Sequence, residues 1–381
     1  MVMQRRFADW IVWMVAAGSF ICACGVKDVA AQNAGAANSR SGRRGAAAPA
    51  QAPSMREITD MAGRKVKIPA KISKIICNGN PLSAACFMVA PEMLMLTMGG
   101  PARDGTKYIP EQFRNIPAGG MGERGGANYE SYISLNPDLI FDGCGKIGGE
   151  PVSGNPLASV EMMQEKLGSI PVVCLDSDIS NYEATLKFMG DVLNVRSRTN
   201  AFIAYYRDVL REVQAKTASI PQSKRVRVYY AEGNDGLSTD PVGSRHTQLI
   251  EFCGATNVAG KDLRGGGASS ISVSKESLLM WNPDVIITSN ANLIRQMYAD
   301  ETWLETKAVK THRIYLIPTK PYNWFDRPPG ANRIVGIPWA AHAFYPNLFT
   351  DDWFRKKIKE FYKLFYQFDL SDADLAALTT P

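Results

Sequence analysis

The sequence lacks the residue patterns that mark most enzymes. It has only three histidines in 381 residues, and it contains no HExxH, GxSxG or phosphate-loop motif. None of its seven cysteines stand at the CxxC spacing of a zinc site. We therefore expect a protein that is not an enzyme, holds no resident metal and needs no cofactor.

The net positive charge is also small once the N-terminal segment is counted separately. The net charge is +6, but residues 1–54 account for +4 of it, which leaves only +2 for the rest. A basic tail of this kind favours contact with anionic lipid over contact with DNA, and no nucleic-acid-binding module follows it. We expect no nucleic-acid partner.

The N-terminus indicates export. Two arginines precede an uncharged run at residues 10–26, as in a secretory signal. We expect residues 1–24 to be a signal peptide with Cys24 as a lipidated cysteine, because Ile-Cys-Ala-Cys resembles a lipobox. Cleavage after Ala31 and an uncleaved anchor are the alternatives. Residues 25–54 are rich in Ala, Gly and Ser and lack aromatics, which predicts a disordered tether. The protein would then lie in the periplasm or on the outer face of the cell membrane.

One stretch of eleven residues occurs twice. It begins at Glu130 and again at Glu276, an offset of 276 − 130 = 146 residues, and both copies contain Asn-Pro-Asp. Each copy predicts a short helix that proline stops, followed by an apolar strand. A repeat of this length is too long for a solenoid unit and indicates two similar lobes.

Strand and helix patterns alternate along both halves, which predicts an α/β fold with mostly parallel sheets. Residues 55–69 predict a hairpin, and an apolar stretch at 82–98 follows a proline at a helix start. Capping-box residues open the last helix at Ser371.

Apart from the signal and the tether, the predicted parts are an N-terminal lobe (55–193), a connecting helix (194–218), a C-terminal lobe (219–348) and C-terminal helices (349–381). Cys174 and Cys253 are expected to be buried free thiols.

Several motifs in order resemble the solute-binding proteins of ABC importers for iron-siderophore, haem and cobalamin. They are Asp60-Met-Ala-Gly-Arg64, the two Asn-Pro-Asp segments, Leu249 to Gly254 with Asn257-Val-Ala259, and the long helix between the lobes. The resemblance implies two Rossmann-like lobes, little hinge bending, and a ligand cleft at the carboxyl ends of the strands. It also implies a monomer that delivers its ligand to a permease with ATPase subunits. The long tether and the aromatic C-terminal tail depart from the family pattern.

Polar and aromatic residues in the predicted strand-end loops are the candidate ligand contacts. In the first lobe they are Asn78, Asn80, Arg124, Asn128 and Cys144. In the second lobe they are Tyr230, Arg245, His246, Asn290, Trp324 and Arg327.

Two of these loops carry the main hypotheses. Trp324 could cover a planar ligand face and Arg327 could grip a carboxylate or hydroxamate, or else Trp324 fills a gap and Arg327 pairs with Asp326. His246 or Tyr230 could ligate a metal, or His246 is a hydrogen-bonded surface residue. Since the sequence offers no evident carboxylate/histidine cluster, we expect a chelated metal as cargo rather than a bare cation.

The family resemblance also assigns a role to Glu130 and Glu276, as one docking glutamate per lobe for the two permease subunits. The alternative is that each only stabilises a helix N-terminus. For the whole protein, the alternative is an exported chelate receptor or a chelate-processing enzyme without a permease.

Overall fold

The computed structural model describes residues 54–119, 129–143, 146–147, 150–151, 157–260 and 270–380. The expected signal peptide, the lipidated Cys24 and almost all of the tether lie outside the described residues. Within the described ranges, no helix is long and apolar enough to cross a membrane.

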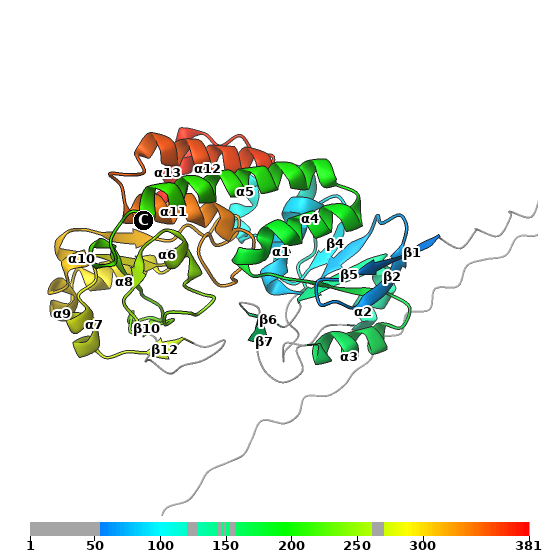
Figure 1. The fold of residues 1–381 in the computed structure, drawn as a ribbon, viewed down its shortest axis with the longest axis horizontal. Coiled ribbons are helices and arrows are strands. Elements are labelled where there is room, and N and C mark those ends of the chain that lie inside the picture. The colour runs from blue at the N-terminus through cyan, green and yellow to red at the C-terminus, as the bar shows by residue number, and fades with distance from the viewer. Residues whose placement is uncertain are drawn as a thin grey trace, which may run out of the picture. The chain divides into compact units, whose positions relative to one another are not determined.

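The first lobe is built on a four-stranded parallel sheet (Figure 1). Its strands, in sheet order, are β4 (Leu94–Thr97), β3 (Ile75–Cys77), β5 (Leu139–Gly143) and β8 (Val172–Leu175). Its helices are α1 (Ser83–Val89), α2 (Tyr129–Leu135), α3 (Ala158–Leu167) and α4 (Tyr182–Leu193). Two antiparallel pairs accompany the sheet, β1 (Met55–Thr59) with β2 (Lys65–Pro69) and β6 (Lys146–Ile147) with β7 (Glu150–Pro151).

The second lobe repeats this plan with a second parallel sheet. Its strands, in sheet order, are β11 (Thr256–Asn257), β9 (Arg227–Tyr230), β13 (Val285–Thr288) and β14 (Ile314–Leu316), and β10 (Ser238–Thr239) pairs with β12 (Ile271–Ser272). Its helices are α6 (Gln248–Phe252), α7 (Lys275–Trp281), α8 (Ala291–Met297), α9 (Glu301–Leu304), α10 (Lys307–Lys310) and α11 (Arg333–Phe344). The predicted α/β fold with a parallel sheet in each lobe is confirmed.

The repeated motif forms the same local structure in both lobes. Helices α2 and α7 end at Asn136 and Asn282, whose φ angles of 46° and 39° are left-handed, a conformation that asparagine tolerates well. The aspartate of each motif then ties its strand to the neighbouring one. Asp138 Oδ2 accepts hydrogen bonds from the backbone just before β3, and Asp284 Oδ2 accepts one from Arg227 N at 2.9 Å at the start of β9. The Asn-Pro-Asp sequence therefore ends a helix and sets the register of the next strand.

A helical layer joins the lobes. The long helix α5 (Arg196–Thr217) lies alongside α12 (Asp351–Phe365), which α13 (Asp372–Thr379) follows (Figure 1). The Phe202 and Phe365 rings stack with centroids 4.1 Å apart. The ammonium of Lys357, whose side chain is only 5% exposed, lies 2.7 Å from Asp208 and 2.9 Å from Glu212 on α5. The predicted capping box at Ser371 is present.

Two elements differ from the sequence-based expectation. The apolar stretch at 82–98 divides into α1 and β4, because Pro91 disfavours a helical conformation in the residue before it. Helix α11 was not predicted, since it is buried on nearly every side and so lacks an amphipathic period. Cys174 and Cys253 are buried and free, as expected.

Candidate functional site

The carboxyl ends of the two parallel sheets form the candidate site. Asn78 directly follows β3, Asp142 lies at the end of β5, and Ser177 follows β8. In the second lobe Glu232 follows β9, and the loop at residues 317–332 follows β14. Because parallel strands all end at one edge, each sheet gathers its loop residues there.

The first-lobe edge holds a small polar group. The Tyr132 hydroxyl donates to Asn78 Oδ1 at 2.7 Å. Burial raises the pKa of Asp142, and a hydrogen bond involving Asn78 opposes that rise. Asn80 is exposed beside this group. Three further candidates, Arg124, Asn128 and Cys144, lie outside the described residues.

The second-lobe edge holds a buried acidic cluster with a histidine. Asp240, His246 and Asp326 offer ligand atoms that all lie within 4.8 Å of one another. His246 Nδ1 lies 2.7 Å from Asp326 Oδ1. The expectation that the loops hold no carboxylate/histidine cluster is therefore wrong, because Asp326 joins Asp240 and His246 only after folding, although it lies 80 residues after His246 in the sequence.

Arg327 neutralises part of this cluster. Its guanidinium bonds to both oxygens of Glu232, reaches Asp240 Oδ2 at 2.7 Å, and lies 3.7 Å from Asp326 Oδ2. The bonds to Glu232 raise the pKa of Arg327 against the opposing effect of burial. The sequence offered pairing of Arg327 with Asp326 as the alternative to ligand binding. That ion pair exists, but it is the longest of the three that Arg327 forms. Three carboxylates share one guanidinium here, which leaves the cluster net negative.

Asp240 should make stability depend on pH. Burial, and next the neighbouring Glu232, raise its pKa from 3.8 to about 6, while His246 opposes the rise. Between about pH 4 and 6 the folded protein therefore binds a proton that the unfolded chain has lost, so this carboxyl lowers stability as the pH rises through that window. We expect Asp240→Asn to remove that part of the slope in urea unfolding measured at pH 4, 5, 6 and 7. An unchanged slope would mean that Asp240 is ionised throughout.

Three other candidate residues serve the scaffold. Trp324 is 0% exposed, so its ring fills the core as in the alternative interpretation and is not available to cover a ligand. Tyr230 is 1% exposed and packs against Phe325. The Asn290 side chain caps α8 by accepting from the amides of residues 292 and 293. Trp324 and Tyr230 therefore present no free surface to a ligand, and Asn290 Oδ1 is engaged in the helix cap.

Arg245 links the two lobes at the candidate site. Its Nη2 donates to Ser177 Oγ of the first lobe at 3.0 Å. Nearby, Gln248 Nε2 donates to Asp178 at 3.1 and 3.2 Å. The loops that end β8 and open α6 therefore meet, and they bring Arg245 and His246 to the boundary between the lobes.

Sequence reasoning missed Glu232 and Asp240. Glu232 stands two residues after Tyr230 at the end of a predicted strand, a position that could have nominated it. Asp240 carried no such signal, because β10 is only two residues long.

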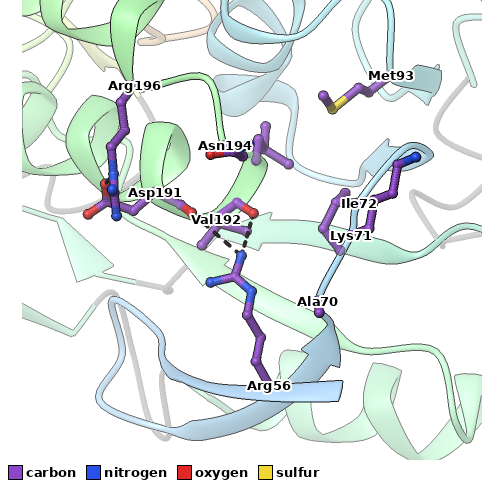
Figure 2. A pocket seen from close by; sticks show the side chains of 10 residues that line it. Arg56, Ala70, Lys71, Ile72, Met93, Asp191, Val192, Asn194 and Arg196 are labelled. Atoms are coloured by element: carbon purple, nitrogen blue, oxygen red, sulfur yellow. Dashed lines mark hydrogen bonds and ion pairs between the residues drawn. The ribbon is translucent and has the colours of Figure 1, made fainter. Parts of the chain in front are cut away.

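A separate pocket of about 610 Å³ lies on the first lobe (Figure 2). Lys71 and Ile72, just before β3, and Val192 at the end of α4 help to line it. Figure 2 shows Arg56 directed at the end of α4, where its Nη2 donates to Val192 O at 2.6 Å. This pocket lies at the amino end of the sheet, opposite the edge where open parallel sheets bind ligands.

Comparison with known proteins agrees with this plan. A family model described as periplasmic binding protein matches residues 102–321, more than half of the chain. The chain belongs to the periplasmic binding protein family. An ABC transporter solute-binding protein from Sulfurospirillum deleyianum is 28% identical, with a TM-score of 0.75 over 85% of this chain and 98% of that one.

Two further relatives bear on what family members bind. The molybdate-binding protein MolA of Haemophilus influenzae is 24% identical over 82% of this chain and 91% of its own length. Helicobacter pylori CeuE, solved with Ni(II) bound, shares the fold with a TM-score of 0.62 at 15% identity, over 85% of this chain and 99% of that one. Members of the family are periplasmic, and these relatives bind solutes and are not enzymes. This chain is therefore a periplasmic binding protein, and the similar protein from Sulfurospirillum deleyianum is named as a solute-binding protein of an ABC transporter.

Proposed function

We propose that the chain captures a metal ion held by anionic oxygen ligands and delivers it to a membrane permease with its ATPase subunits. A ferric siderophore is the foremost ligand. Haem and cobalamin, whose metals are held by ring nitrogens, are the other metal chelates that we consider. The protein would act in the periplasm, or on the outer face of the membrane if Cys24 carries a lipid.

The pairing of His246 with Asp326 carries this proposal. A carboxylate only accepts hydrogen bonds, so in the neutral imidazole Nδ1 bears the proton and Nε2 keeps its lone pair. A buried carboxylate that fixes the tautomer in this way is the usual support of a metal-ligating histidine. His246 would then ligate the metal centre of the bound complex.

The charges around His246 favour a complexed metal over a bare cation. The guanidinium of Arg327 already occupies the carboxylates of Glu232 and Asp240. A bare divalent ion would have to displace that multiply bonded cation, which lies partly exposed over buried carboxylates. A chelate brings its own oxygens to the metal, and the neighbouring Arg245 can pair with their negative charge.

A metal oxyanion is the second candidate. The relative from Haemophilus influenzae is named for molybdate binding. Arg245 suits such a ligand as well as it suits a chelate, because a guanidinium binds either set of oxygens.

Isothermal titration of the full chain tests the proposal. The probes are a ferric catecholate siderophore, haem, cobalamin, sodium molybdate, and aqueous Fe³⁺ and Zn²⁺. We expect tight binding of one complex and at least about a tenfold loss of affinity in His246→Asn, the scale seen when metal-site residues are removed. The matched control is His312→Asn, since His312 is exposed on the second lobe.

Tight binding of aqueous Fe³⁺ or Zn²⁺ with no response to any complex would overturn the proposal. Equal losses in the two histidine variants would remove His246 from the binding site.

A further inference from the structure

Arg56 has hydrogen-bond donors that the folded chain does not use. It lies on β1, and its Nη2 donates to two carbonyls at the end of α4, Val192 O at 2.6 Å and Asp191 O at 3.5 Å. Its Nη1 and Nε form no hydrogen bond with a residue that the structure describes, and the Nε atom is buried. Burying a donor without an acceptor is unfavourable, so an acceptor that bound beside Arg56 would be stabilised there.

A structural role accounts for only part of this side chain. The carbonyls that end a helix form its negative pole, and a cation that bonds to them stabilises the helix. Arg56 fills that role for α4 through Nη2 alone. The other donors add nothing to this cap, and in the described part of the chain no carboxylate side chain pairs with the guanidinium.

Two more cations line the same pocket. Lys71 is exposed and forms no ion pair with any residue in the described ranges. Arg196, at the start of α5, pairs with Asp191, but these side chains are 70% and 40% exposed, so a ligand can compete for Arg196 at little cost. In the view of Figure 2, Lys71 and Arg196 lie on opposite sides of the Arg56 guanidinium.

The charge and the size of the pocket indicate what it would bind. Three cations and the carboxylate of Asp191 give the lining a net charge of +2, and Ala70, Ile72 and Met93 add apolar surface. The volume of about 610 Å³ is typical of pockets for small organic ligands. A phosphate monoester carries a charge of about −1.5 to −2 at pH 7 and has three strong acceptor oxygens, so it matches both the charge and the free donors.

We infer that this pocket is a second ligand site, which binds a small organic phosphate monoester on the first lobe and is separate from the candidate site between the lobes. The phosphate would accept from Arg56 and pair with Lys71 and Arg196, while the apolar lining would contact the organic part. The hairpin of β1 and β2, the end of α4 and the start of α5 meet here, so a bound ester would hold these elements together.

Isothermal titration of glycerol 3-phosphate into the full chain tests this inference. We expect saturable binding, and a melting temperature that rises with the concentration of the ester. Succinate is the chemical control, because its two charges lie at opposite ends and cannot converge on Arg56. Binding of succinate as tight as that of the ester would overturn the assignment to a phosphate.

Three variants locate the binding. Lys71→Gln should leave the melting temperature of the ligand-free chain unchanged and weaken binding by up to about fivefold, the scale of one exposed ion pair. Arg56→Gln should weaken binding about tenfold or more, since charge-assisted hydrogen bonds are lost, and it also removes the cap of α4. Lys67→Gln is the matched control, because Lys67 is exposed on β2 and does not line the pocket. Equal losses in the Lys71 and Lys67 variants would overturn the inference.

Vesicles of phosphatidylcholine, with and without phosphatidic acid, distinguish a free ester from a lipid headgroup that carries the same phosphate. Binding of glycerol 3-phosphate in solution assigns the pocket to a free ester. Binding only to the vesicles that contain phosphatidic acid, weakened by Lys71→Gln, assigns it to a headgroup. The inference falls if the unaltered chain binds neither probe, or if it binds only vesicles and Lys71→Gln does not weaken that binding. His246→Asn should leave every result unchanged, because His246 belongs to the other site.

Discussion

Exchanging both Glu130 and Glu276 for lysine should abolish ligand uptake in cells while leaving ligand affinity and melting temperature nearly unchanged. Both glutamates are exposed and lie in the first turns of α2 and α7, the helices that open the repeated motif. Neither forms an ion pair with a residue that the structure describes. Exposed charges at matched points of two similar lobes suit a partner with two equivalent subunits, and such rim charges steer association and fix register.

The residues around the glutamates support a contact surface. One helical position in each copy is buried, Tyr132 in α2 and Leu278 in α7. Three residues after each glutamate, and so on the same helix face, Ile133 is 49% exposed and Leu279 is 39% exposed. An exposed acid beside an exposed aliphatic side chain in both lobes is more than a helix N-terminus requires, since that role needs only the charge.

A matched variant separates docking from helix stability. Glu301 lies in the first turn of α9 in the second lobe, so Glu301→Lys should cost the same few tenths to about 1 kcal/mol through the helix dipole. Uptake of labelled ligand, or stimulation of the permease ATPase, should fail only in the double variant. Normal uptake, or failure that coincides with unfolding, would leave Glu130 and Glu276 as helix-end residues.

Replacing Gly336 by alanine should destabilise the protein by about 3 kcal/mol or more, which is large for one methyl group. In an ordinary helix this change stabilises by roughly 0.5–1 kcal/mol. Here the added Cβ would lie 1.9 Å from Trp324 O and 2.8 Å from Leu249 Cδ1. A backbone carbonyl cannot rotate away, so α11 would have to separate from the loop that carries Asp326 and Arg327.

Urea unfolding measures the stability change, and ligand titration should show a parallel loss because the loop shifts. Gly260→Ala is the control, since a Cβ there meets nothing within 4 Å. Equal stability of the two variants would show that the contact between α11 and the loop is not rigid.

The sequence reveals much of the scaffold because its signals are local. The repeat at Glu130 and Glu276 contains its own helix stop, so α2, α7, β5 and β13 could all be predicted from it. The capping residues at Ser371 likewise act within one turn. Local signals fail for α11, whose apolar residues face inward on nearly every side.

The candidate site was harder to predict because tertiary contacts assemble it. His246 and Arg327 were visible as polar residues in loops, but their partners Asp240 and Glu232 approach them only through the packing of β9, β10 and the 317–332 loop. Trp324 was expected to be accessible because it is an aromatic residue in a predicted loop. The structure buries it, and its backbone lies against Gly336 of α11, a helix that was not predicted.

The aromatic C-terminal tail, which departs from the family pattern, stiffens α5 by packing α12 alongside it. A lone helix of 22 residues, about 33 Å long, bends under modest force, whereas two helices fixed side by side resist bending together. Lys357 fixes α12 to α5 through the ion pairs of its buried side chain. Burial alone would lower the pKa of Lys357, but Asp208 and Glu212 raise it and keep the ammonium charged. The paired helices α5 and α12 then hold α2 and α7 at a nearly fixed distance from each other. The permease would therefore meet the same spacing of the two helices whether or not the site is filled.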